Sequence, residues 1–387
     1  MVGGKSKGRA RVGPSKKQCE EPTVDISYVA INRIVERRAA EDAAYRRKLQ
    51  ESGRPLLSQG RAMSDDALLS KLGSLGLEAE RAPLEALFPG FVSAQATAEA
   101  MIGRAEFEVP DDEIDWVWIA ITCLWERWQP DVPNMEMVDD KMQAGYAAPS
   151  EGKSQQACRL WLETWRAILE ILDRAEIRSL DEFDERFAGT QCVFNWVQDL
   201  ELELHNAGLQ EPQFFRERIS LCETMINRFA GGSLPTSGFK RALAESHFEL
   251  SDEQCGDRLF RGWLDDEPQW GEGWLAWAEC YWPFAASRTR DPAKTEQILK
   301  EGLAVTGVQN RAALLEQLAG LYEETGREEE ARAVREDIRQ ADGPKKATTT
   351  TVRTKVTYDF GEEGLPLDQF QDFAESLSGS SPLARKS

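Results

Sequence analysis

The sequence has only two histidines, His205 and His247, and its seven cysteines are scattered without a CxC or CxxC pair. Structural zinc modules are built from closely spaced Cys and His ligands, so this pattern excludes one. The cysteine number is odd, which is not the pattern of a disulfide framework. We therefore expect reduced, mostly buried thiols, with no metal and no cofactor.

Long apolar runs are also missing, because none approaches the roughly 18 residues of a membrane-spanning helix. The N-terminal stretch MVGGKSKGRARVGPSKKQ is basic, but no apolar segment follows it as in a secretory signal. Its GGKS, residues 3–6, lacks the preceding strand and first glycine of a phosphate-binding loop. We expect a cytoplasmic protein without a nucleotide site of this kind.

Basic residues are outnumbered, 47 against 67 acidic residues, and the formal net charge is −20. The excess is uneven, because residues 1–62 hold fourteen Lys and Arg against seven Asp and Glu. An acidic body repels nucleic acid and anionic membranes, whereas a basic segment attracts them. We expect no membrane contact, and nucleic acid only through residues 1–62, where Arg46, Arg47 and Lys48 cluster. An RNA- or ribosome-associated factor that uses this basic head is one alternative for the function.

Composition and helical periodicity divide the chain into five segments. The ends are rich in Gly, Ser, Thr or charge and have little to bury, which predicts disorder. Ser64 precedes two acids and an apolar run, which is the pattern of a helix N-cap. The expected segments are a disordered basic head (1–24), a helix and linker (25–62), a helical domain (63–232), tetratricopeptide-like repeats (233–342) and a low-complexity tail with a short amphipathic helix (343–387).

Tryptophan is frequent, with twelve residues, and several recur at helical spacing. DDEIDWVWIAITCLWERW places Trp118 and Trp125 on one helical face, and RLWLETWRAILEIL does the same for Trp161 and Trp165. Indole stripes with this period are far more often core than ligand site. We expect these four side chains to be structural.

The region after the linker AGGSLPTSG is periodic. QLAGLYEETGREEEA places Leu318, Ala319, Tyr322, Gly326 and Ala331 at the packing positions of a tetratricopeptide repeat, whose period is about 34 residues. Because each hairpin buries its apolar face on its neighbours, three hairpins are enough for a stable stack. We predict an all-α chain, with a helical N-terminal domain followed by an α-solenoid of about three tetratricopeptide-like hairpins. The upstream matches to the frame are Leu243, Ala244, His247, Gly256, Phe260 and Pro268, then Trp274, Trp277, Ala278 and Tyr281.

In tetratricopeptide stacks the first helix of each hairpin lines the concave surface, and this resemblance implies which residues face inward here. The implied groove is acidic and suits a basic, partly aromatic protein segment, through charge complementarity and cation–π contact. The favoured function is a non-enzymatic scaffold or adaptor with a protein partner. The alternative is that the acids only keep the stack soluble and Trp282 packs on the neighbouring helix. The implied partner-binding residues are Arg241, Glu245, Phe248, Glu249, Glu279, Trp282, Glu316, Gln317, Glu323 and Glu324.

Three longer stretches carry a family resemblance: LWERWQPDVPNMEMVDDKMQAGY, FDERFAGTQCVFNWVQDLELELHNAG and WLDDEPQWGEGWLAWAECYWPF. They resemble bacterial proteins that join a helical domain to tetratricopeptide-like hairpins and often carry a SEC-C motif, a small Cys-rich zinc-binding module. The resemblance covers roughly residues 64–340 and implies the same fold, without an established activity. The chain departs from the family because neither end has the SEC-C cysteines, and Cys19 alone cannot supply four ligands.

Candidate chemistry is limited to the two histidines. His247 falls at a packing position of the repeat, which favours a core role. Glu201 and His205 lie four residues apart, so on a helix they face the same way. A metal-dependent enzyme is a second alternative if the carboxylates of MEMVDDKM, Glu136, Asp139 and Asp140, converge on this pair. Otherwise His205 is a solvated residue favoured by the helix C-terminus.

Overall fold

The computed structural model describes residues 26–105, 109, 113–147, 153–229, 235–282 and 289–341. Within these ranges the chain forms eighteen α-helices and one 3-10 helix, and it forms no strand. The prediction of an all-α fold is confirmed. The head and the tail that the sequence predicts to be disordered lie outside the described residues.

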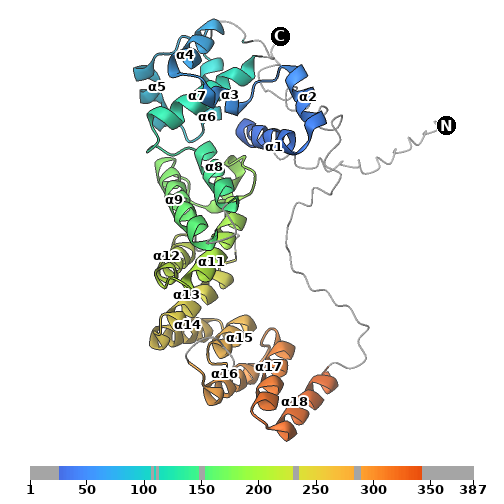
Figure 1. The fold of residues 1–387 in the computed structure, drawn as a ribbon. Helices are drawn as coiled ribbons and strands as arrows, with labels where there is room; N and C mark the ends of the chain where they lie inside the picture. The colour runs from blue at the N-terminus through green and yellow to red at the C-terminus, as the bar shows by residue number, and fades with distance from the viewer. Residues whose placement is uncertain are drawn as a thin grey trace, which may run out of the picture.

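The described helices form an elongated body, with an N-terminal unit at one end and helix pairs that follow one another toward the other end (Figure 1). None of these helices is long and apolar enough to cross a membrane. The N-terminal unit comprises α1 (Tyr28–Glu41), α2 (Ala43–Ser52), α3 (Leu57–Ala62), α4 (Asp65–Ser74), α5 (Arg81–Leu87), the 3-10 helix η1 (Phe88–Gly90), α6 (Ala94–Ile102) and α7 (Ile114–Trp128).

The remaining helices stack mainly as antiparallel neighbours, α8 with α9, α11 with α12, α13 with α14, α15 with α16 and α17 with α18. The solenoid-like arrangement agrees with the expected fold class. The bounds are α8 (Met135–Tyr146), α9 (Lys153–Arg174), α10 (Leu180–Arg186), α11 (Val193–Gly208), α12 (Gln213–Arg228), α13 (Ser237–Glu249), α14 (Glu253–Asp266), α15 (Gly271–Cys280), α16 (Pro292–Ala304), α17 (Arg311–Glu324) and α18 (Glu328–Ala341).

Local sequence signals set several helix ends. Ser64 accepts a hydrogen bond from the backbone N–H of Ala67 at the start of α4, so its predicted N-cap role is confirmed. Gly326 has a φ of 73° in the turn between α17 and α18. Because L side chains rarely adopt that conformation, a glycine at this turn avoids strain.

The tryptophan stripes lie in the cores. Trp125 of α7 is fully buried and stacks on Phe88, with ring centroids 4.6 Å apart. Trp161 and Trp165 of α9 are also buried, whereas Trp118 is only partly buried against the same core as Trp125. The predicted core position is confirmed for Trp125, Trp161 and Trp165, and Trp118 packs at the edge of the core.

Three hydrophobic clusters follow one another along the described residues. The first lies within the N-terminal unit, the second extends from α8 to α13, and the third extends from α13 to α18. Helix α13 belongs to two of them, because Phe239 and Leu243 pack in the second and Ala244 and Phe248 pack in the third. Residues 230–234 of the expected linker lie outside the description, and a domain boundary between residues 232 and 233 stays a prediction.

The N-terminal unit is tied to α8 by buried carboxylates. Glu136 accepts hydrogen bonds from the Ser93 hydroxyl and from the backbone N–H groups of Ala94 and Gln95, at the start of α6. Burial raises the pKa of Glu136 in spite of these hydrogen bonds. Asp139 is buried as well and pairs with Arg33 of α1. These acids therefore serve the joint between α1, α6 and α8.

Candidate functional site

Charged side chains from four helices meet where α11, α12, α13 and α15 adjoin. Helix α12 lies between α11 and α13, and α13 also contacts α15. We call this region the acidic face and define it by four carboxylates and two guanidinium groups. Its residues are Glu201 (α11), Arg218 (α12), Arg241, Glu245 and Glu249 (α13), and Glu279 (α15).

Arg218 is the buried centre of the acidic face, with 4% of its surface exposed. Its Nε donates to Oε1 of Glu201 at 2.6 Å, and its terminal nitrogens donate to Ser246 Oγ at 3.1 Å and to Glu245 Oε2 at 3.4 Å. A buried guanidinium costs several kcal/mol unless carboxylates and hydrogen bonds surround it. Arg218 therefore fixes the positions of Glu201 on α11 and Glu245 on α13.

Glu245 contacts both Arg218 and Arg241, whereas Glu279 makes no ion pair with another residue of the described part of the chain. Burial raises the pKa of Glu245, and Glu201 raises it further, against the opposing charges of Arg241 and Arg218. Glu279 is exposed, but partial desolvation raises its pKa, and the second cause is the charge of Glu245. A carboxylate whose pKa is raised by burial and by like charge is stabilised when a cation approaches. The negative charge of these two side chains is therefore only partly offset by Arg218 and Arg241.

His205 borders the acidic face as a neutral ring. Burial and the neighbouring Arg218 lower its pKa, against Glu249 and Glu201. Its Nδ1 is buried without a hydrogen-bond partner, and its ring meets Phe215 edge-on at 5.8 Å. The prediction that Glu201 and His205 lie on one helix is confirmed by α11.

The carboxylates named for a metal site do not join this pair. Glu201 is bonded to Arg218, and Glu136 and Asp139 serve the joint with α6 and α1. Asp140 pairs with Arg33 and Arg61. Among the residues that the structure describes, a different group offers three converging ligand atoms, namely His247, Asp252 and Cys255, within 4.8 Å of one another.

The two aromatic residues expected in the groove have different positions. Phe248 is buried, with 5% of its surface exposed, and packs edge-on against Tyr281 at 5.3 Å. Its ring also lies over Gly256 of α14, where an added Cβ would come within 2.4 Å of the ring. The expectation that Phe248 lines a surface is therefore corrected, because its position on α13 turns it toward α14. Trp282 is partly buried against the third cluster, near Gly320 of α17.

The four residues expected from α17 do not form one charged surface. Glu323 makes two hydrogen bonds to Arg335 of α18, at 2.7 and 2.8 Å, so its charge is compensated within its own hairpin. Glu316 and Glu324 are exposed. Gln317 has a buried side-chain oxygen without a hydrogen-bond partner. Of the expected set, the structure brings Arg241, Glu245, Glu249 and Glu279 together.

Sequence reasoning missed Arg218, although it organises the acidic face. The stretch FFRERISL gives no sign of which arginine is buried, because Arg216 and Arg218 are both charged neighbours of apolar residues. The helical period could have indicated that Arg218 is buried, because Arg218 lies three residues from Phe215 and four from Cys222 and so shares a helical face with these two buried residues.

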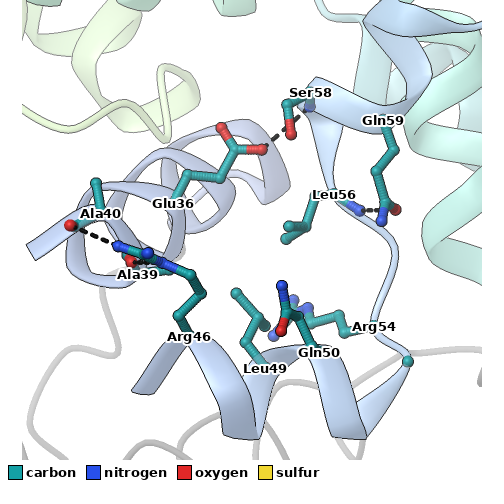
Figure 2. A pocket seen from close by; sticks show the side chains of 11 residues that line it. Glu36, Ala39, Ala40, Arg46, Leu49, Gln50, Arg54, Leu56, Ser58 and Gln59 are labelled. Carbon is teal, nitrogen blue, oxygen red and sulfur yellow. Dashed lines mark hydrogen bonds between the residues drawn. The ribbon is translucent and has the colours of Figure 1, made fainter. Parts of the chain in front are cut away.

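A cleft of about 650 Å³ lies between α1, α2 and the start of α3 (Figure 2). Several of its polar groups already have partners. Arg46 donates to the backbone oxygens of Ala39 and Ala40, and Glu36 accepts from the N–H of Ser58. Arg46, one of the basic residues considered for nucleic acid, thus caps the end of α1.

Comparison with family models, with curated proteins and with solved structures finds no match to this chain.

Proposed function

We propose that this chain is a non-enzymatic interaction scaffold whose acidic face binds a basic, partly aromatic segment of a partner protein. The observation that supports this most is that Glu245 and Glu279 come together from the adjacent helices α13 and α15, where the charge of Glu245 helps to raise the pKa of Glu279. Lysine or arginine from a partner would relieve the repulsion between these carboxylates.

The charge balance of the acidic face supports the same class of partner. Four carboxylates share two guanidinium groups, and Arg218 is already engaged by Glu201, Glu245 and Ser246. Arg241 is the more exposed of the two and lies 3.3 Å from Glu245. Electrostatic complementarity of this kind favours specificity and rapid association with cationic segments.

Trp282 supplies the aromatic part of the proposal. It follows α15, three residues after Glu279, and its side chain is only partly buried. The part of its indole that remains accessible could receive an arginine or lysine through cation–π contact. The partner segment that fits best therefore combines basic with aromatic residues.

The proposal is tested with a labelled peptide of alternating lysine and tyrosine, whose binding to the full chain is followed by fluorescence anisotropy. Glu245→Gln combined with Glu279→Gln should weaken binding about tenfold, because two carboxylates of the acidic face lose their charge. The matched control is Glu163→Gln combined with Glu329→Gln, which removes the same charge from exposed positions on α9 and α18. If both double variants lose affinity equally, peptide binding reflects net charge and the proposed face is wrong.

A further inference from the structure

The turn between α13 and α14 brings together a thiol, an imidazole and a carboxylate. Sγ of Cys255 lies 3.6 Å from Nε2 of His247, within hydrogen-bond distance for sulfur. Nδ1 of the same ring lies 3.4 Å from Oδ2 of Asp252. The imidazole is therefore placed between the thiol and the carboxylate, with one ring nitrogen toward each.

Backbone geometry holds the three residues in place. Asp252 is the N-cap of α14 and accepts from the N–H of Cys255 at 3.2 Å, while its own N–H donates to the backbone oxygen of His247 at 2.8 Å. Ser251 adopts a φ of 60°, which reverses the chain between the two helices. Gly256 lets the Phe248 ring pack closely against α14. The contact between His247 and Cys255 thus follows from the shape of the turn.

We propose that Cys255 is a nucleophilic thiol, activated by His247 and oriented through Asp252, and that it is the site at which this protein exchanges with low-molecular-weight disulfides. A carboxylate beside Nδ1 favours the imidazole tautomer that carries its proton there, which leaves Nε2 to accept the thiol proton. This is the arrangement of an activated nucleophile, in which a base contacts the thiol and a third group orients the base.

The exchange is balanced without any further reactant. The Cys255 sulfur attacks one sulfur of the small disulfide as its proton passes to Nε2 of His247. The disulfide bond of the small molecule breaks, a mixed disulfide forms on Cys255, and the departing thiolate takes the proton back from the imidazole. Cys255 is oxidised and the small molecule yields one equivalent of reduced thiol.

The geometry favours this assignment over a metal centre. One ligand atom from each of His247, Asp252 and Cys255 lies within 4.8 Å of the others, but the thiol and the carboxylate contact different nitrogens of the imidazole ring. An ion held by Sγ and Nε2 would therefore meet a ring whose other nitrogen contacts Asp252. In such a centre Asp252 would only orient the imidazole from outside the coordination sphere.

Exposure allows the reaction. Asp252 has 53% of its side chain exposed and His247 has 18%, and Cys255 is partly exposed. Cys192 is more exposed than Cys255, yet partial desolvation raises the pKa of its thiol. The remaining cysteines of the described part of the chain, Cys123, Cys158, Cys222 and Cys280, are buried. Cys192 is therefore an internal reference within the same molecule.

The test treats the folded, full-length protein with limiting 2,2′-dithiodipyridine and measures the mixed disulfide at each cysteine by peptide mass spectrometry. We expect Cys255 to react about tenfold or more faster than Cys192, since a positioned base accelerates proton transfer by at least that factor. His247→Gln should bring the ratio of the two rates to about one or below. Equal rates for Cys255 and Cys192 in the parent would overturn the proposal.

The substitution Asp252→Asn distinguishes the role of Asp252 in orienting His247 from its role as the N-cap of α14. Asparagine is as good an N-cap as aspartate, so the thermal midpoint should be unchanged. The Cys255 rate should fall nonetheless, because the carboxylate that orients His247 is gone. An unchanged rate in this variant and in His247→Gln would overturn the assignment. So would a Cys255 that reacts only after a chelator is added, because that result would reveal a bound ion.

Discussion

Arg218 of α12 donates to Glu201 of α11 at 2.6 Å from a position that is almost fully buried. The same guanidinium reaches Glu245 of α13, so one side chain links three consecutive helices. One buried cation therefore fixes the positions of two of the four carboxylates of the acidic face, those of Glu201 and Glu245.

Replacing Arg218 by alanine should destabilise the protein by about 3 kcal/mol or more, since it removes a buried cation that pairs with the partly buried carboxylates of Glu201 and Glu245. Urea denaturation measures this loss. Arg216→Ala is the matched control, because Arg216 is exposed on the same helix, and it should change stability by less than about 0.5 kcal/mol. Equal effects of the two substitutions would mean that Arg218 does not organise the interface between α11, α12 and α13.

Trp125→Ala should cost about 3–5 kcal/mol, because a fully buried indole leaves a large cavity. The substitution also removes the hydrogen bond from Nε1 to the backbone oxygen of Val132, at 2.8 Å. Trp116 of the same helix is only partly buried, and its replacement by alanine should cost less than half as much. Thermal and urea denaturation of both variants provide the comparison, and similar losses would contradict the core role of Trp125.

Asp184 gives the fold a pH dependence of definite sign. Burial raises its pKa to about 6, although its carboxylate accepts from the N–H groups of Val193 and Phe194 at the start of α11. The native state holds this proton more tightly than the unfolded chain, whose Asp pKa is about 3.9. The contribution to stability is thus fully present below about pH 4 and is lost as pH rises through about 6.

Asp184→Asn removes this titration. As pH rises from about 4 to 7, the parent should therefore lose stability that the variant keeps, so the free energy of unfolding of the variant should increase relative to that of the parent. Urea denaturation at a series of pH values measures the difference. A difference that is independent of pH would show that Asp184 has the same pKa in the folded and unfolded chain.

Peptide binding should depend on pH for a related reason. The raised pKa values of Glu245 and Glu279 mean that both carboxylates gain protons at a higher pH than an ordinary glutamate. Affinity for the lysine and tyrosine peptide should fall as pH decreases, starting above the ordinary Glu pKa of about 4.3. In the variant with Glu245→Gln and Glu279→Gln the affinity should be flat over this interval. The same slope in both proteins would place the responsible acids elsewhere.

Sequence patterns within one or two helical turns were sufficient to predict the helices and part of the core. Helical spacing identified Trp125 and Trp161 as buried, and the residue pattern after Ser64 identified an N-cap, because both signals depend on neighbours within one or two turns. The all-α fold follows from the same periodicity.

Contacts between different helices could not be predicted by those local patterns. Phe248 was expected at a surface because the repeat frame fixes a helical face, but the small size of Gly256 on the next helix decides where the ring packs. His247 and Cys255 are eight residues apart on different helices, so only the reversal at Ser251 brings them together. Arg218 joins residues 17 and 27 positions away, a relation that no single helix period encodes.

Hydrogen–deuterium exchange of the full-length chain, with and without the lysine and tyrosine peptide, tests the central claim most directly. Bound peptide should slow exchange in α13 and α15, residues 237–249 and 271–280, which carry Arg241, Glu245, Glu249 and Glu279. The variant with Glu245→Gln and Glu279→Gln should lose that protection. Protection confined to residues 1–62, or unchanged exchange in α13 and α15 at saturating peptide, would contradict the assignment of the acidic face as the binding site.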